Sequence, residues 1–205
     1  MGDPQTVQLT PASVSSRPPD LHRAARALSF SHAHEVAHAH LYRVAFDDGI
    51  VTEIAPTDHA AMFRFTFRHD RSQLIFDNRN DHGGIVLDPS SRSFSGWSDV
   101  KSRLSAGAGR LFFYGMVDRA VTESGRLHGA GRDHVAAWFG FDTSKDKVVH
   151  LRIATSLISV AQARHNLALE IAPDEGFDEV RERAQRAWDR QLGILTVGGA
   201  SRDEL

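Results

Sequence analysis

The sequence LYRVAFDDGIVTEI, residues 41–54, consists of two runs rich in apolar and β-branched residues on either side of Asp47-Asp48-Gly49. An Asp-Gly pair between two such runs is typical of a β-hairpin, because glycine adopts positive φ without strain. The stretch therefore predicts two strands, Leu41–Phe46 and Ile50–Ile54, joined by a tight turn.

The segments that follow this hairpin continue the pattern. Aromatic residues at 63, 65 and 67 alternate with other side chains, which predicts a strand over Met62–Phe67 with one aromatic face on the core. Turn residues recur about every eight to twelve positions, the spacing of an antiparallel all-β domain. Further strands are predicted over Leu74–Phe76, Gly84–Leu87, Arg92–Gly96, Arg110–Met116, His134–Phe141 and Lys147–Ile153.

After Ile153 the apolar residues take helical spacing. Ser159-Val160-Ala161-Gln162 fits a capping box and predicts a helix that runs to about Glu170. A second amphipathic helix is predicted to end at Gly193, with its apolar stripe made by Phe177, Val180, Ala184, Ala187, Trp188 and Leu192. The predicted fold class is mostly β: an antiparallel β-sandwich followed by two C-terminal α-helices. Its predicted parts are a polar, Pro-rich and poorly ordered segment (1–27), the sandwich (28–154) and a helical segment (155–205).

Composition excludes several functional classes. Lys and Arg total 24 against 26 Asp and Glu, so the chain lacks the positive charge that nucleic-acid binding needs. The absence of cysteine excludes a thiol nucleophile and every Cys-ligated metal centre. No apolar run approaches the ~20 residues of a membrane helix, and no signal peptide is visible. We expect neither a nucleic-acid nor a membrane partner, and the cellular compartment stays open.

Histidine is unusually abundant, with four of the twelve within residues 32–40. His34-Glu35-Val36-Ala37-His38 matches the zincin pattern, but that pattern requires a helix and a strand-like segment follows here. A second interpretation is that His32, His34, His38 and His40 share a strand face and bind a metal adventitiously. The third is a solvated, His-rich approach to the strand at Leu41.

The segment from Asp77 to Gly84 is predicted to be a polar loop between two strands. It is rich in oxygen ligands of the kind that bind calcium or sugar hydroxyls, although it does not fit an EF-hand loop. A simple hairpin loop rich in Asn and Gly is the alternative.

Taken together, these segments resemble the N-terminal domain of glycoside hydrolase family 92, the exo-α-mannosidases. The resemblance extends from about Leu28 to Leu205. Its pieces, similar to the family in order and spacing, are FSHAHEVAHAHLYRVAFDDGIVTEIAPTDHAAMFRFTF, LIFDN, GWSDVKSRLSAGAGRLFFYG, LRIATSLISVAQARHNLALE and FDEVRERAQRAWDRQLG.

The resemblance implies a two-domain enzyme in which the sandwich packs against an (α/α)6 barrel and the sugar pocket lies at their junction. It implies calcium-dependent hydrolysis of terminal α-mannosides with inversion, by carboxylates and calcium ligands of a barrel that is expected to begin just after Leu205. No catalytic residue, metal ligand or cofactor is therefore assigned to this chain, which is expected to be inactive alone. The implied partners are an α-mannoside glycan and the catalytic barrel.

Five residues are candidates for contact with the sugar: His32, Glu35, Asp77, Asn78 and Trp97. Family members are usually secreted or periplasmic. Two alternatives stay open: a stand-alone carbohydrate-binding or interaction module, and a His-ligated metal protein.

Overall fold

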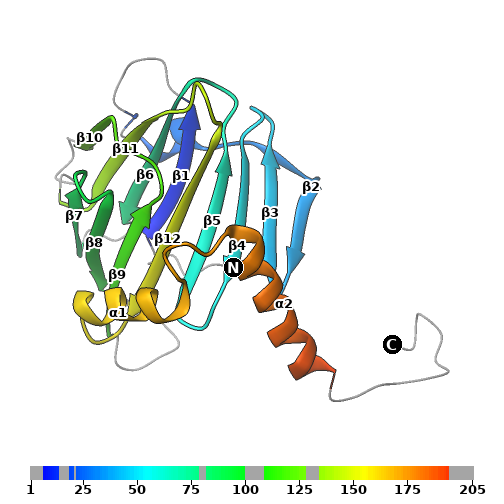
Figure 1. Cartoon of the computed structure of the whole chain (residues 1–205). Coiled ribbons are helices and arrows are strands. Elements are labelled where there is room, and N and C mark those ends of the chain that lie inside the picture. The colour runs from blue at the N-terminus through cyan, green and yellow to red at the C-terminus, as the bar shows by residue number, and fades with distance from the viewer. Residues whose placement is uncertain are drawn as a thin grey trace.

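The structure is a computed structural model, and it describes residues 7–13, 19–20, 22–78, 82–99, 109–127 and 134–193. Two antiparallel sheets face each other, as Figure 1 shows. The first has the order β1-β6-β11-β10, with strands β1 (Val7–Ser13), β6 (Arg71–Asn78), β11 (Ala136–Asp142) and β10 (Glu123–Arg126). The second has the order β2-β3-β4-β5-β12-β9-β8-β7. Its strands are β2 (Phe30–His38), β3 (Leu41–Phe46), β4 (Val51–Pro56), β5 (Ala60–Thr66), β12 (Val148–Ser156), β9 (Arg110–Val117), β8 (Ser93–Asp99) and β7 (Gly83–Asp88).

The hairpin predicted from residues 41–54 is present as β3 and β4. Phe46 donates its backbone N–H to the carbonyl of Ile50 at 2.8 Å, and Gly49 between them has φ +88°. Only glycine adopts that conformation readily, which explains the Asp-Gly sequence.

A phenylalanine core joins the two sheets. Phe76 of β6 stacks on Phe94 of β8 with ring centroids 3.9 Å apart, and Phe139 of β11 meets Phe76 edge to face. Phe65 and Phe67 are also buried in this cluster, so the predicted aromatic face at 63, 65 and 67 does face the core. Burying aromatic side chains of this size is the main apolar contribution to the stability of such a sandwich.

The two helices form a third layer on the outer face of the eight-stranded sheet. They are α1 (Val160–Glu170) and α2 (Phe177–Leu192), both close to the predicted ranges. A second apolar cluster lies between helices and sheet, with Leu167 of α1 and Phe177 of α2 packed near Met62 of β5 and Tyr114 of β9. In Figure 1, α1 lies across the ends of β9 and β12, and α2 starts at β4 and extends beyond the strands.

The caps of the helices agree only in part with the capping box that the sequence predicts. Ser159 accepts a hydrogen bond from the backbone N–H of Gln162 at 3.0 Å, as expected of an N-cap serine. The Gln162 amide, however, donates to Asn166 one turn later instead of returning to Ser159. In α2, the Glu179 carboxylate accepts from the Gly176 N–H at 2.8 Å, and Gly193 follows the last turn as predicted.

The structure corrects the prediction of disorder at the N-terminus for the part that it describes. Val7–Ser13 form strand β1, which pairs with β6 along its whole length, and Arg23–Arg26 form a short 3-10 helix. Strand β10 was not predicted, because Glu123–Arg126 contain no apolar residue, and a strand over the His-rich segment, now β2, was only one of three interpretations. No helix in the described residues is long and apolar enough to cross a membrane.

Candidate functional site

The five residues predicted to contact a sugar lie in two parts of the molecule. His32 and Glu35 are on β2, at one edge of the eight-stranded sheet, whereas Asp77, Asn78 and Trp97 gather near the other end, where β6 approaches β8. The structure therefore does not bring the five together in one site.

Asp77 and Asn78 belong to β6, not to the predicted polar loop. Asp77 is 2% exposed and accepts hydrogen bonds from Arg23 at 2.8 and 3.1 Å and from Arg26 at 2.6 Å. Asn78 is fully buried, donates to the carbonyl of Trp97 at 3.3 Å and accepts from the Ser98 hydroxyl at 3.1 Å. Both side chains are enclosed, so a sugar has no access to them in this conformation.

Trp97 lies beside these residues with its ring covered on one face. The guanidinium of Arg110 lies 3.6 Å from the ring centroid, a cation–π contact. A Cβ on Gly84 would approach the indole Nε1 to 2.8 Å, and one on Gly83 would approach the Asn78 amide to 1.9 Å. The Gly83-Gly84 pair thus serves close packing around Trp97 and Asn78.

The β2 candidates form a small polar cluster at the sheet edge. Glu35 accepts from the Tyr42 hydroxyl at 2.6 Å and lies 2.5 Å from Nδ1 of His32. The Tyr42 bond, followed by the one with His32, lowers the pKa of Glu35. Burial, together with the same bond to Glu35, raises the pKa of Tyr42 to about 12. The cluster fixes the orientation of Tyr42 on β3.

The histidine-rich segment is a strand, which removes the helix that the zincin pattern requires. The ring centroids of His38 and His40 are 5.4 Å apart in a stacked pair, whereas the His32 ring contacts the Glu35 carboxylate. Among the residues that the structure describes, no group of three or more His, Asp or Glu side chains is placed to hold a metal ion. The geometry therefore does not favour the zincin interpretation or the shared metal site.

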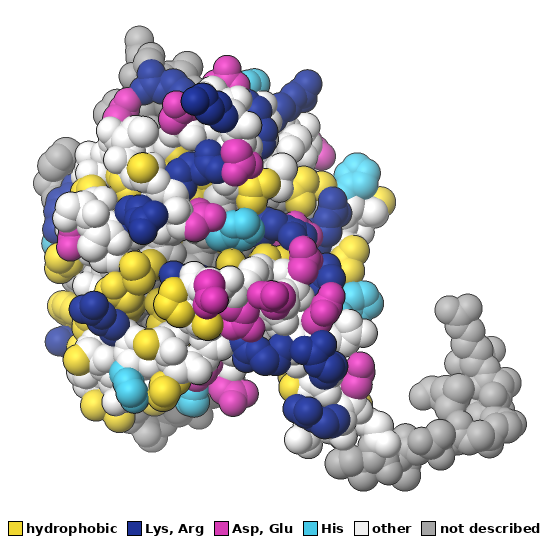
Figure 2. All heavy atoms as spheres, viewed as in Figure 1, with side chains coloured by type: hydrophobic (Ala, Val, Ile, Leu, Met, Phe, Trp, Pro, Cys, Tyr) yellow, Lys and Arg dark blue, Asp and Glu magenta, His cyan; other side chains and the backbone are white. Residues whose placement is uncertain are grey.

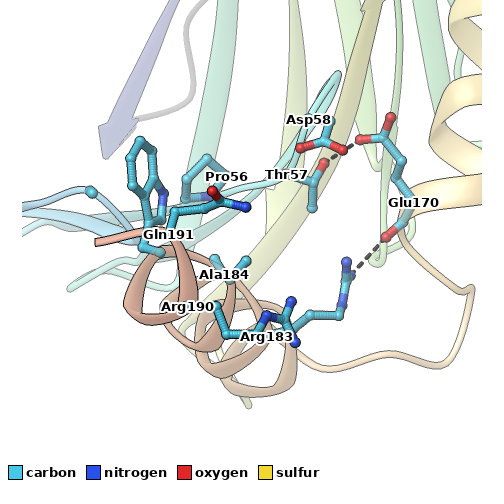
Figure 3. A pocket seen from close by; sticks show the side chains of 11 residues that line it. Pro56, Thr57, Asp58, Glu170, Arg183, Ala184, Arg190 and Gln191 are labelled. Atoms are coloured by element: carbon cyan, nitrogen blue, oxygen red, sulfur yellow. Dashed lines mark hydrogen bonds between the residues drawn. The ribbon is translucent and has the colours of Figure 1, made fainter. Parts of the chain in front are cut away.

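A cleft of about 620 Å³ lies between α2 and the turn that joins β4 to β5. We call it the α2 cleft. Figure 3 shows Pro56 at the end of β4 and Thr57 and Asp58 of the turn on one side, and residues of α2 on the other: Ala184, Arg190 and Gln191. The sequence did not predict this site, because it depends on where α2 crosses the sheet.

Glu170, the last residue of α1, holds the turn that forms this cleft. Its carboxylate accepts from the Thr57 hydroxyl at 2.5 Å and from the His59 and Ala60 backbone N–H groups at 2.8 and 3.1 Å, and Nδ1 of His59 lies 2.7 Å away. Burial alone would raise the pKa of Glu170, but these hydrogen bonds and the nearby His59 outweigh it, so the net shift is downward. A carboxylate with this many donors is a structural anchor at neutral pH.

Arg183 closes the same side of the cleft. It donates to the carbonyl of Glu170 at 2.7 Å, as Figure 3 shows, and forms a forked pair with Glu175 at 2.9 and 3.1 Å. The charges of Arg183 and Glu170 are thus satisfied by the protein. Trp188, on the distal part of α2, lines the cleft and is 43% exposed. The sequence places Trp188 in the apolar stripe of the predicted helix, so its exposure at this cleft could not be predicted from the sequence.

Comparison with known proteins identifies the family to which the chain belongs. The model of the glycosyl hydrolase family 92 N-terminal domain matches residues 1–156 of this chain. The chain belongs to this family. The matched region of the family 92 N-terminal domain ends at the last residue of β12, so both sheets fall within it. No curated protein matches the chain.

Solved structures share the fold of this family 92 N-terminal domain. A family 92 inverting mannosidase of Bacteroides thetaiotaomicron superposes with a TM-score of 0.85 and 23% identity over 95% of this chain. A family 92 alpha-mannosidase of the same organism, in complex with mannoimidazole, gives 0.77 and 19% over 98% of this chain. The chain spans only 27% and 29% of these two structures.

Proposed function

We propose that this family 92 N-terminal domain is the non-catalytic β-sandwich part of a calcium-dependent, inverting exo-α-mannosidase, and that it forms one wall of a sugar pocket completed by a catalytic domain. The observation that supports this most is the superposition of nearly the whole chain on about a quarter of an inverting mannosidase. Its function is then to shape and cover a site whose reacting groups come from elsewhere.

The carboxylates of the chain support a non-catalytic role. Inverting hydrolysis needs an acid of raised pKa and a carboxylate base about 6.5–9.5 Å from it. The pKa values of Asp20, Glu35, Asp88, Asp142, Asp146 and Glu170 are all lowered, and the enclosed Asp77 and Glu170 are bonded to protein donors. These groups suit structure better than proton transfer.

Calcium does not fit the described residues either. It takes about six to eight oxygen ligands, whereas no three His, Asp or Glu side chains gather there, and Asp77 is occupied by two arginines. In our proposal the calcium ligands belong to the catalytic domain.

The outer side of α1 is the surface that we expect to face the catalytic domain. Leu157 and Ile158, which precede α1, are 72% and 75% exposed, and Leu169 in its last turn is 71% exposed. Figure 2 shows hydrophobic side chains near α1, whereas charged side chains lie along α2. Large apolar side chains left exposed around one helix are typical of a contact surface. Covering it would remove that apolar area from water and fix the sandwich against its partner.

A chimera tests the proposal. This chain replaces the corresponding N-terminal domain of the Bacteroides inverting mannosidase, and hydrolysis of an aryl α-mannoside is followed with and without a calcium chelator. We expect calcium-dependent hydrolysis with an inverted anomeric product by NMR, and no turnover by the 205-residue chain alone. Turnover by the purified chain alone, or a retained product, would contradict the proposal.

Two substitutions in the chimera test the contact surface. Leu169→Glu places a charge in the expected interface and should lower the thermal midpoint and the hydrolysis rate. Val86→Glu, at a site that is 61% exposed on β7, is the matched control and should change neither. Equal effects of the two variants would exclude α1 as the contact surface.

A further inference from the structure

The α2 cleft contains polar groups without partners. Asp58, Arg190 and Gln191 line it with exposed side chains, and within the described part of the chain they make no hydrogen bond or ion pair. Trp188 lines the same cleft and presents a large part of its side chain to solvent. Three unused hydrogen-bonding groups beside one exposed indole are typical of a small-molecule site.

The remaining wall of the cleft is apolar and of suitable size. Pro56, Ala184 and Ala187 line it between the turn and the helix. Its volume of about 620 Å³ lies within the roughly 300–1,000 Å³ of common ligand pockets. The cleft therefore has room for one or two sugar rings.

The charges of the cleft favour a neutral ligand. Glu170 and Arg183 are satisfied by protein groups, which leaves one anionic side chain, Asp58, and one cationic side chain, Arg190. These two cancel, so neither an anion nor a cation is selected. A pyranose fits the set, because its C–H face can pack on an indole while its hydroxyls donate to a carboxylate and pair with an amide.

The turn and the start of α2 are held in place before any ligand arrives. Glu170 fixes the turn through Thr57, and Arg64 fixes the start of α2 by a bond to Asp178 at 3.0 Å and a contact with the Phe177 ring at 4.3 Å. Preformed walls reduce the entropy that binding costs.

We infer that the α2 cleft is a binding site for a neutral pyranoside, with Trp188 as the stacking platform, Asp58 as hydroxyl acceptor and Gln191 as the amide partner. This goes beyond the proposed function, because the chain would contact a glycan without a catalytic domain. Only the choice of a mannoside as the probe rests on the proposed function.

The test uses the three tryptophans of the full chain as reporters. Their indole N–H signals are followed by NMR while methyl α-mannopyranoside is added to about 20 mM, well above the Kd on the order of 1 mM expected for a monosaccharide. We expect a saturable shift of the Trp188 signal alone. Trp138 is buried and Trp97 is covered by Arg110, so their signals should stay in place and also report that the fold is intact.

Variants make the inference falsifiable. Asp58→Ala should weaken binding at least tenfold, and Trp188→Ala should abolish sugar binding measured by ligand-observed NMR. Leu192→Ala, at an exposed site on the same helix, is the control that should bind as the unmodified chain does. The inference is overturned if the Trp188 signal does not shift, if glycerol at equal concentration shifts it as much, or if Asp58→Ala binds unchanged. Because hydrolysis is not measured, failure of sugar binding here can be distinguished from failure of the proposed mannosidase role.

Discussion

Glu170 at the end of α1 accepts the Thr57 hydroxyl of the β4–β5 turn at 2.5 Å, which joins two elements 113 residues apart in the chain. The same carboxylate accepts hydrogen bonds from two backbone N–H groups at that turn. One side chain thus fixes the position of the turn against the helical layer.

Replacing this carboxylate should destabilise the protein measurably. Glu170→Gln places an NH2 group among donors, so at least one bond is lost, and we expect a decrease of about 1–3 kcal/mol in the free energy of unfolding by urea. Glu182→Gln, an exposed carboxylate on α2, is the control that should change it by less than about 0.5 kcal/mol. An unchanged stability of Glu170→Gln would mean that the turn does not depend on this anchor.

The stabilisation that the Glu170 carboxylate provides should decrease at low pH. The folded-state pKa of Glu170 lies below its ordinary value of 4.5, so its contribution to stability is present above that pH and is lost as the pH falls through the folded-state pKa. The stability difference between the unmodified chain and Glu170→Gln should therefore shrink in acid. A difference that stays constant down to the acid transition would contradict the lowered pKa.

The Tyr42 hydroxyl should lose its proton only at high pH. Its pKa is raised to about 12, so the neutral hydroxyl is favoured in the folded state, and the stabilisation that it gives is lost as the pH rises from about 10 to about 12. Ultraviolet absorbance of tyrosinate should show a step near 12 that is absent in Tyr42→Phe. Glu35→Gln should move that step to lower pH, because the carboxylate no longer opposes ionisation. An unmoved step would mean that Glu35 has no part in the shift.

Arg64 should be the main polar anchor of α2. It bonds to Glu53 at 2.6 and 2.9 Å and to Asp178 at 3.0 Å, and Arg64→Ala would leave the half-buried Glu53 with a weaker partner. We expect a loss of roughly 2 kcal/mol in urea unfolding. Arg181→Ala also removes a bond to Asp178 but leaves Glu53 paired with Arg64, and it should cost less than about 0.5 kcal/mol. Similar losses in both variants would deny Arg64 this role.

Gly96 should not tolerate a side chain. A Cβ there would lie 2.0 Å from the backbone oxygen of Gly84 and 2.5 Å from the Phe113 ring, and neither can move without disturbing the sheet. Gly96→Ala is therefore expected to cost about 1–3 kcal/mol or more by overpacking. Gly109→Ala, whose nearest neighbour would be 3.9 Å away, is the matched control. A stable Gly96→Ala would show that β7 can shift relative to β8.

The strands that the sequence predicts are those whose apolar residues alternate between turn residues, such as β3, β4 and β5. Their pattern is local, and burial of one face selects the same conformation in the fold. Strand β1 contains Pro11 and polar residues and forms because β6 offers it a partner more than 50 residues away. Such long-range pairing leaves no local signal.

The candidate sites were harder to predict, because they too depend on contacts between residues that are distant in the sequence. Asp77 and Asn78 were interpreted as open loop residues because oxygen ligands and glycines follow one another there. Arg23 and Arg26, distant in sequence, convert them into an enclosed polar network. The α2 cleft requires a helix to pass over a turn, and no spacing of residues encodes that crossing.

The pairing of β1 with β6 has a consequence for any shortened version of the protein. A chain that began at residue 28 would lose β1 and both arginines that bond to Asp77. The backbone of β6, whose Leu74, Ile75 and Phe76 are fully buried, would then become an open edge with unpaired N–H and C=O groups. An apolar open edge is a template for strands of other molecules, so proteolytic loss of residues 1–27 would convert a stable domain into a seed for aggregation.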